Sequence, residues 1–111
     1  MVLAIDFDHV ICDRAHPDPD HKMGPPMRGC GKALRKLKAQ GHWIIIHSCN
    51  RPEAIRRWMG YFDLPYTEIW AGMGKPVADC YIDDAAIRFE NWSQVMDELE
   101  VWDYKRDWGT K

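Results

Sequence analysis

The most constraining feature of the sequence is a short apolar run, residues 2–5 with Phe7, that carries two aspartates, Asp6 and Asp8, at its C-terminal edge. A nearly continuous apolar run of this length is typical of a strand buried on both faces, as in a parallel sheet. In open α/β sheets, ligands bind beyond the carboxyl ends of the strands, where these acids would lie. From this stretch alone, a catalytic pair and a pair that caps the following turn are equally good interpretations.

Composition limits the classes of protein to which the chain can belong. With 111 residues, 46% of them hydrophobic, we expect one domain over residues 1–111 with a modest core. The net charge of −2 gives no general attraction to nucleic acid or anionic membranes, and no apolar run approaches the roughly 20 residues that span a bilayer. The four cysteines form no CxxC pair, which favours free, buried thiols in a reducing compartment. With no signal peptide recognised, we expect a cytoplasmic protein without membrane contact.

Strand and helix patterns alternate along the chain, which predicts a three-layer α/β fold, a central parallel sheet with helices on both faces. Residues 13–28 contain four prolines and are expected to form a long, flap-like loop beside the two acids. The expected strands cover residues 2–7, 42–47, 67–70 and 77–82, and the expected helices cover residues 29–40, 52–62 and 92–100.

The last expected helix carries an apolar stripe, formed by Trp92, Val95, Met96 and Leu99, that we expect to face the core. The C-terminal tail, residues 101–111, mixes aromatic and charged residues. Its sequence leaves open whether it packs on the domain or forms a subunit contact.

Polar residues follow the expected strands, and in a parallel sheet they would all lie at one edge. Crowded carboxylates raise one another's pKa unless a cation compensates, and oxygen ligands suit Mg²⁺. A hydroxyl and a lysine would complete what phosphoryl transfer requires. These residues are Asp6, Asp8, Ser48, Lys75, Asp83 and Asp84.

In this order, the residues resemble the four motifs of the haloacid dehalogenase (HAD) superfamily of phosphohydrolases: DFDHV at 6–10, a serine after a strand, a lysine, and an acidic pair after another strand. The resemblance extends from about residue 2 to about residue 92. Each motif alone is common, but all four in order are specific. A response-regulator receiver domain also combines acids, a hydroxyl and a lysine, but there the lysine comes last, whereas here an acidic pair follows it.

The resemblance implies a HAD-like, Rossmann-like fold and a role for each residue. Asp6 would be the nucleophile that forms an aspartyl-phosphate, and Asp8 would protonate the leaving group and then activate water. Ser48 would hydrogen-bond the phosphoryl group, and Lys75 would offset its negative charge. The implied groups around Mg²⁺ are Asp6, the main-chain carbonyl of Asp8, Asp83 and, directly or through another ligand, Asp84.

Two departures from the family pattern bear on the substrate. His9 stands where a small residue, often glycine, is common in the family. The chain also leaves no room for a cap domain, so the resemblance implies a capless enzyme with an open site. Such members commonly act on larger substrates or take cover from a neighbouring subunit, so a homo-oligomer is compatible with the sequence. The candidate substrate-binding residues, each of which also has a structural interpretation, are His9, His47, Asn50 (which also suits a helix N-cap) and Arg51.

The leading hypothesis is a Mg²⁺-dependent phosphatase that acts on a sugar phosphate or another small phosphorylated metabolite. A phosphatase for nucleotides or nucleic-acid 3′ ends is an alternative, because an open site admits a strand end and the lysines of residues 32–38 could follow a backbone. The net charge of −2 weighs against this alternative. A binding or regulatory module without turnover is an alternative of another class, although every expected catalytic position is filled.

Overall fold

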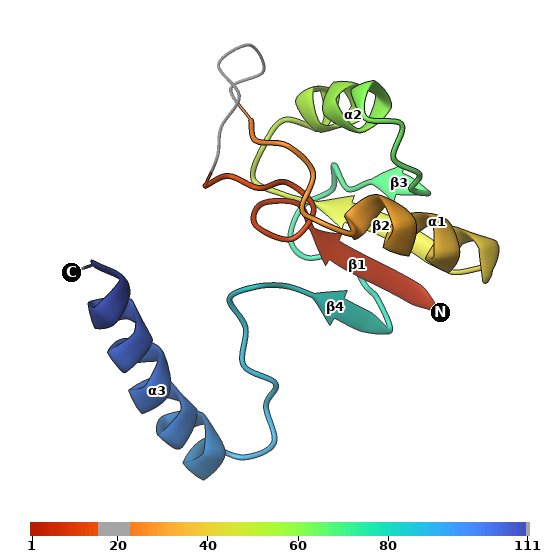
Figure 1. Cartoon of the computed structure of the whole chain (residues 1–111). Helices are drawn as coiled ribbons and strands as arrows, with labels where there is room; N and C mark the ends of the chain where they lie inside the picture. The colour runs from red at the N-terminus through yellow and green to blue at the C-terminus, as the bar shows by residue number, and fades with distance from the viewer. Residues whose placement is uncertain (16–22, 111) are drawn as a thin grey trace.

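Four parallel strands form the sheet at the centre of the structure, in the spatial order β3, β2, β1, β4 (Figure 1). The computed structural model describes residues 1–15 and 23–110 of the chain. An α/β fold with an all-parallel sheet was expected and is confirmed. The strands are β1 (Val2–Asp6), β2 (Trp43–His47), β3 (Glu68–Ile69) and β4 (Cys80–Ile82), and the helices are α1 (Cys30–Ala39), α2 (Pro52–Tyr61) and α3 (Trp92–Thr110).

Strand β1 is paired on both sides, and its register decides which side chains meet beyond its end. Asp6 is opposite His47 in β2, and Ile5 is opposite Ile82 at the end of β4. Because β4 ends at Ile82, Asp83 follows it at the level of Asp6. The register therefore aligns the carboxyl ends of the three strands.

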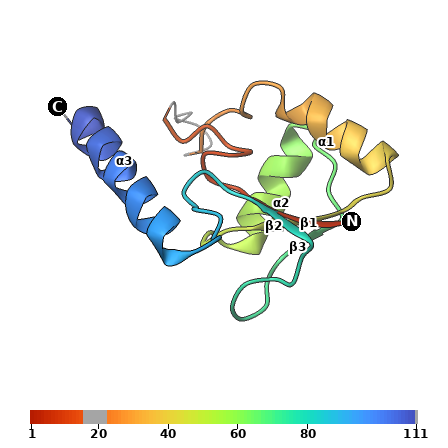
Figure 2. The ribbon, with the colours of Figure 1, turned by 90° about the horizontal axis from the view of Figure 1, so that it is seen from below.

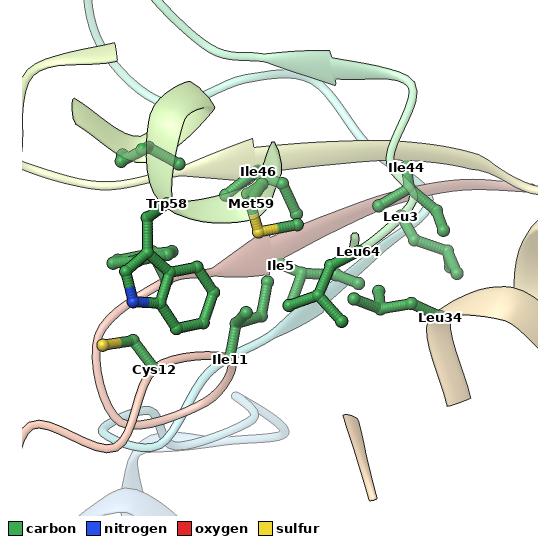
Figure 3. Packing of buried hydrophobic residues seen from close by; sticks show 12 residues of the cluster. Leu3, Ile5, Ile11, Cys12, Leu34, Ile44, Ile46, Trp58, Met59 and Leu64 are labelled. Atoms are coloured by element: carbon green, nitrogen blue, oxygen red, sulfur yellow. The ribbon is translucent and has the colours of Figure 1, made fainter. Parts of the chain in front are cut away.

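One face of the sheet carries the hydrophobic core (Figure 3). Leu3 and Ile5 point to the same side because side chains alternate along a strand, and Ile44 and Ile46 are opposite them in β2. Burial of each such side chain stabilises the fold by about 1.5–3 kcal/mol. The remaining buried members of this cluster are Phe7, Ile11, Cys12, Leu34, Ile55, Trp58, Met59 and Leu64.

Helices α1 and α2 both lie over this core face, so the expectation of helices on both faces is wrong for the described chain (Figure 2). The reason is the strand order: right-handed crossovers that step in one direction, from β1 to β2 to β3, place both helices on the same side. The loop between β3 and β4 approaches the other face. There the hydroxyl of Tyr81, which is opposite Ala4, donates a 2.7 Å hydrogen bond to the carbonyl of the buried Pro76.

Strand β4 is shorter than the strand expected at residues 77–82. The side chain of Val77 is 90% exposed and takes no part in the sheet. Asp79 joins the start of β4 to β1, because its N–H donates to the carbonyl of Val2 (2.8 Å) and its carboxylate accepts the N–H of Val2 (2.7 Å). The three residues of β4 itself are all exposed.

Helix α3 differs most from expectation. It begins after Asn91, whose side-chain oxygen accepts the N–H of Gln94 (2.8 Å), and it continues through the segment expected as a tail. Its apolar stripe does not face the core: Trp92 is 71% exposed, Met96 60% and Leu99 43%. The helix lies apart from the sheet in both views (Figures 1 and 2). None of the described helices is both long enough and apolar enough to cross a membrane.

The flap expected at residues 13–28 is described only at its two ends, since residues 16–22 lie outside the described chain. Its second end is tied to α2 by Trp58, whose indole N–H donates to the carbonyl of the buried Gly24 (3.0 Å). The same indole packs edge-on against Phe7, with 5.0 Å between ring centroids. The flap is therefore attached to the core beside the end of β1.

All four cysteines are free, as expected, but only part of the expectation of burial is met. Cys12 is buried and Cys30 is half-buried, and burial raises the pKa of both thiols. Cys49 and Cys80 are exposed, because each lies in or beside a strand end that reaches the surface.

Replacement of Trp58 by Phe tests the attachment of the flap. Among the described residues, this leaves the buried Gly24 carbonyl with only the weak thiol donor of Cys12 (3.6 Å), so we expect the free energy of unfolding to fall by about 1–3 kcal/mol. The matched control is Trp70→Phe, because the Trp70 indole donates to an exposed carbonyl, that of Gly74, which water can satisfy. Urea denaturation measures both, and equal losses would contradict the assigned role of the buried bond.

Candidate functional site

Three carboxylates converge at the carboxyl edge of the sheet, as the sequence predicted. Asp6 ends β1, and Asp83 and Asp84 follow β4 directly. One oxygen from each of the three lies within 4.8 Å of the others. A set of oxygen donors at this spacing fits a hard divalent cation such as Mg²⁺.

The electrostatics of this group also favour a bound cation. The pKa of Asp6 is raised, first because the carboxyl is partly buried and then because of the negative charge of Asp83, with smaller contributions from Asp8 and Asp84; the ring of His47 opposes the shift. The pKa of Asp83 is lowered, chiefly because its carboxylate accepts the backbone N–H of Ala85 (3.0 Å). Partial burial and the ionised Asp83 beside it therefore both make ionisation of Asp6 less favourable than that of an exposed carboxyl, and an added positive charge would offset this effect.

The second acid, Asp8, is held by three donors. The hydroxyl of Ser48 donates to its carboxylate (3.1 Å), and the side-chain amide of Asn50 lies 3.2 Å from both carboxylate oxygens. Arg14 adds an ion pair, with its Nε at 3.2 Å. Ser48 is itself oriented by Asn50, whose backbone N–H donates to the hydroxyl (3.0 Å). This network fixes Asp8 two residues beyond the end of β1, the strand that carries Asp6.

Arg14 was not singled out from the sequence. It lies in the proline-rich loop six positions after Asp8, and this closeness in the sequence is the one signal that could have identified it. Asn50 was expected as a helix N-cap as well as a substrate-binding residue, and the capping assignment is wrong. The N-cap of α2 is Arg51, which makes no side-chain cap bond, while the side chain of Asn50 binds Asp8.

An open pocket of about 600 Å³ lies beside Asp6. Lys75 lines it, with its ammonium 3.8 Å from the centroid of the Tyr81 ring, so the lysine is presented on an aromatic face. Trp70 also lines the pocket, although the sequence analysis did not identify it as a site residue. A side chain in place of Gly72 would meet the Trp70 ring at 2.7 Å, which explains the glycine at that position.

The structure brings most of the predicted site residues to this pocket. The residues of the predicted set that line it are Asp6, His47, Ser48, Asn50, Lys75 and Asp83. The Nε2 atom of His47 is buried and has no hydrogen-bond partner within the described ranges. His9 and Arg51 are exposed and do not line this pocket. The backbone of His9 is left-handed (φ 65°), a conformation that glycine adopts more readily than residues with a side chain.

Comparison with known proteins supports the fold alone. The chain matches no protein-family model and no curated protein. A solved structure of a conserved protein encoded by a locus of Bacteroides thetaiotaomicron is similar, with a TM-score of 0.62 and 20% sequence identity over 90% of this chain and 89% of that chain. Likeness at this identity shows a shared fold, so any assignment of chemistry depends on the site itself.

Replacement of Asp6 by Asn tests the crowding of the carboxylates. Because the pKa of Asp6 is raised in the folded state, its ionised form destabilises the fold, and the substitution should raise the melting temperature at pH 7 in EDTA by about 2–5 °C. The gain should shrink as the pH falls through the raised pKa of Asp6, because the carboxyl of the unsubstituted protein then takes up its proton.

Millimolar Mg²⁺ should reverse this order, stabilising the unsubstituted protein more than the Asp6→Asn variant. The control is Asp97→Asn, which removes an exposed acid of α3 and should change neither response. Differential scanning fluorimetry across pH measures all three proteins. The acid cluster would not be a cation site if Mg²⁺ shifted the melting temperatures of all three equally.

Proposed function

We propose that the chain is a Mg²⁺-dependent phosphatase of the HAD type, with a HAD-like fold that lacks a cap domain, and that it hydrolyses a phosphate monoester through an aspartyl-phosphate on Asp6. The observation that carries this proposal is the convergence of Asp6, Asp83 and Asp84 within 4.8 Å, next to a separately held Asp8. Two acids with different surroundings suit two different roles, one as nucleophile and one as acid and base.

In the proposed first step, a carboxylate oxygen of Asp6 attacks phosphorus as the bond to the leaving oxygen breaks. Asp8, protonated at this stage, gives its proton to the leaving oxygen. In the second step, Asp8 takes a proton from water while the water oxygen attacks phosphorus, and the bond to Asp6 breaks to release inorganic phosphate. The donors from Asn50 and Arg14 orient the Asp8 carboxyl for both steps.

Bound Mg²⁺ would be held by Asp6, Asp83 and Asp84, with the main-chain carbonyl of Asp8, and would neutralise the negative charge of the carboxylates and the phosphoryl oxygens. Lys75 lines the same pocket as Asp6, and its flexible side chain would carry a second positive charge to the phosphoryl group. Ser48 would donate its O–H to a phosphoryl oxygen in place of its present hydrogen bond to Asp8.

The substrate that we favour is a sugar phosphate or another small phosphorylated metabolite. The pocket has room for more than a phosphate group, and Trp70 supplies an apolar wall beside it. His47 and Asn50 line the pocket and would contact the substrate directly, whereas a role for His9 or Arg51 requires a substrate that reaches beyond it.

Phosphate release tests this proposal. We expect release from at least one member of a panel of sugar phosphates, nucleotides and 3′-phosphorylated oligonucleotides in Mg²⁺, and none in EDTA. Because an asparagine amide cannot attack phosphorus as the Asp6 carboxylate would, Asp6→Asn should retain less than about 1% of the activity. The matched control, Asp97→Asn, should retain full activity.

The pattern across the panel separates the alternatives. Preference for the oligonucleotide, with activity that falls steeply as salt rises, would indicate a nucleic-acid end as the substrate. Binding of Mg²⁺ and of a phosphate analogue such as vanadate, without release from any substrate, would indicate a binding module. Activity of Asp6→Asn above a few per cent would overturn the assigned nucleophile.

A further inference from the structure

Helix α3 carries an apolar stripe that no other part of the described structure covers. Its members recur at helical spacing, so they form one continuous stripe along the first three turns. Trp102, at the end of the stripe, is also 41% exposed. Most of the stability of a helix in a protein comes from packing of its apolar face, and a contiguous exposed apolar surface of this kind marks an interaction site. The stripe consists of Trp92, Val95, Met96, Leu99 and Trp102.

The segment before α3 directs the helix away from its own sheet. The side chain of Gln94 accepts the N–H of Glu90 (3.1 Å) and donates to the carbonyl of Arg88 (3.1 Å). Ile87 and Arg88 lie beside Val101 and Trp102, around a hollow on the flank of the helix. These contacts join residues 86–91 to the first three turns of α3 as one unit, and none of them ties that unit to the sheet.

The domain also has an apolar groove that no described segment fills. It lies between α1 and β4, on the face of the sheet that carries the core, and has a volume of about 330 Å³. Arg28 is the charged residue among those that line it. The apolar side chains along the groove include Ile5, Val10, Met27, Ala33, Leu37 and Ile82.

The charges on the two surfaces are complementary. The ten residues of α1 include four basic side chains and no acid. Of these, Lys32 and Lys36 are exposed and lie four residues apart, beside the groove-lining Ala33 and Leu37. Residues 92–102 of α3 include three acids, Asp97, Glu98 and Glu100, and no base. Basic side chains therefore border the apolar groove, and acidic side chains border the apolar stripe.

We propose that the stripe of α3 docks in the groove between α1 and β4 of a second copy of this chain, and that the second copy returns the same contact. Each copy supplies one helix and receives one, so the exchange closes a symmetric dimer with two identical interfaces. This arrangement buries both apolar surfaces and places the acids of α3 beside the lysines of α1. It depends on neither Mg²⁺ nor the assignment of the catalytic residues.

The first test is the mass of the full chain in solution, by sedimentation equilibrium from 1 to 100 µM of protein, concentrations that bracket the affinity of a modest interface (about 10 µM). We expect a dimer. Leu99→Glu places a charge in the stripe and should weaken dimerisation by at least about tenfold. Ser93→Glu adds the same charge to α3 outside the stripe and should leave the dimer intact.

The second test distinguishes docking in the groove from pairing of α3 with α3. Ala33→Glu places a charge in the groove at an exposed helical position and should also give a monomer, with folding verified by circular dichroism. A mixture of Leu99→Glu and Ala33→Glu should then form a heterodimer, because one intact helix meets one intact groove. Ala33→Arg is a second groove variant, for use if Ala33→Glu is unfolded.

Two outcomes would overturn the proposal. A dimer that survives both groove variants but not Leu99→Glu would show that the helices pair with each other. An unsubstituted chain that stays monomeric at 100 µM would show that the stripe docks within its own chain or remains exposed.

Discussion

The pairing of β1 with a strand on each side is the constraint on which the rest of the structure depends. A buried strand must satisfy its backbone groups on both edges, and Ala4, at the centre of β1, is fully buried. Because all the pairings are parallel, the same hydrogen bonds that stabilise the centre of the sheet bring three carboxyl ends together. The crowding of Asp6 against Asp83 is therefore a direct consequence of how the core is built, and after partial burial it is the next cause of the raised pKa of Asp6.

Much of this arrangement follows from local patterns in the sequence. The apolar runs predicted β1 and β2. The spacing of apolar residues predicted both helices within two residues of their observed ends, with Gly41 (φ 87°) marking the end of α1 and Pro52 the start of α2. These signals depend only on residues that are close together in the sequence, so they can be recognised without knowledge of the tertiary structure. The convergence of Asp6 with the acids after β4 was also predictable, because parallel strands share one carboxyl edge. The assignment of the family and of the reaction is still a prediction.

The remaining features depend on contacts that no local pattern encodes. Arg14 and Asn50 meet at Asp8 only because a loop and a strand end approach one another in the folded chain. The strand order, not the alternation of elements, put both helices on one face of the sheet. The stripe of α3 was predictable as an apolar surface, but an apolar surface does not specify whether the chain's own core or another molecule will cover it.

The short edge strand β4 makes the acid cluster a locally labile part of the molecule. It has three exposed residues, and within the described sheet it is paired to β1 alone, with partners far away in the sequence. Local opening of such an edge requires much less free energy than global unfolding, and amide hydrogen exchange should be fastest where it occurs. When β4 separates from β1, Asp83 and Asp84 leave Asp6 together. The cluster is thus assembled and dismantled as a unit, and any ligand that bridges the three carboxylates also fastens the edge of the sheet.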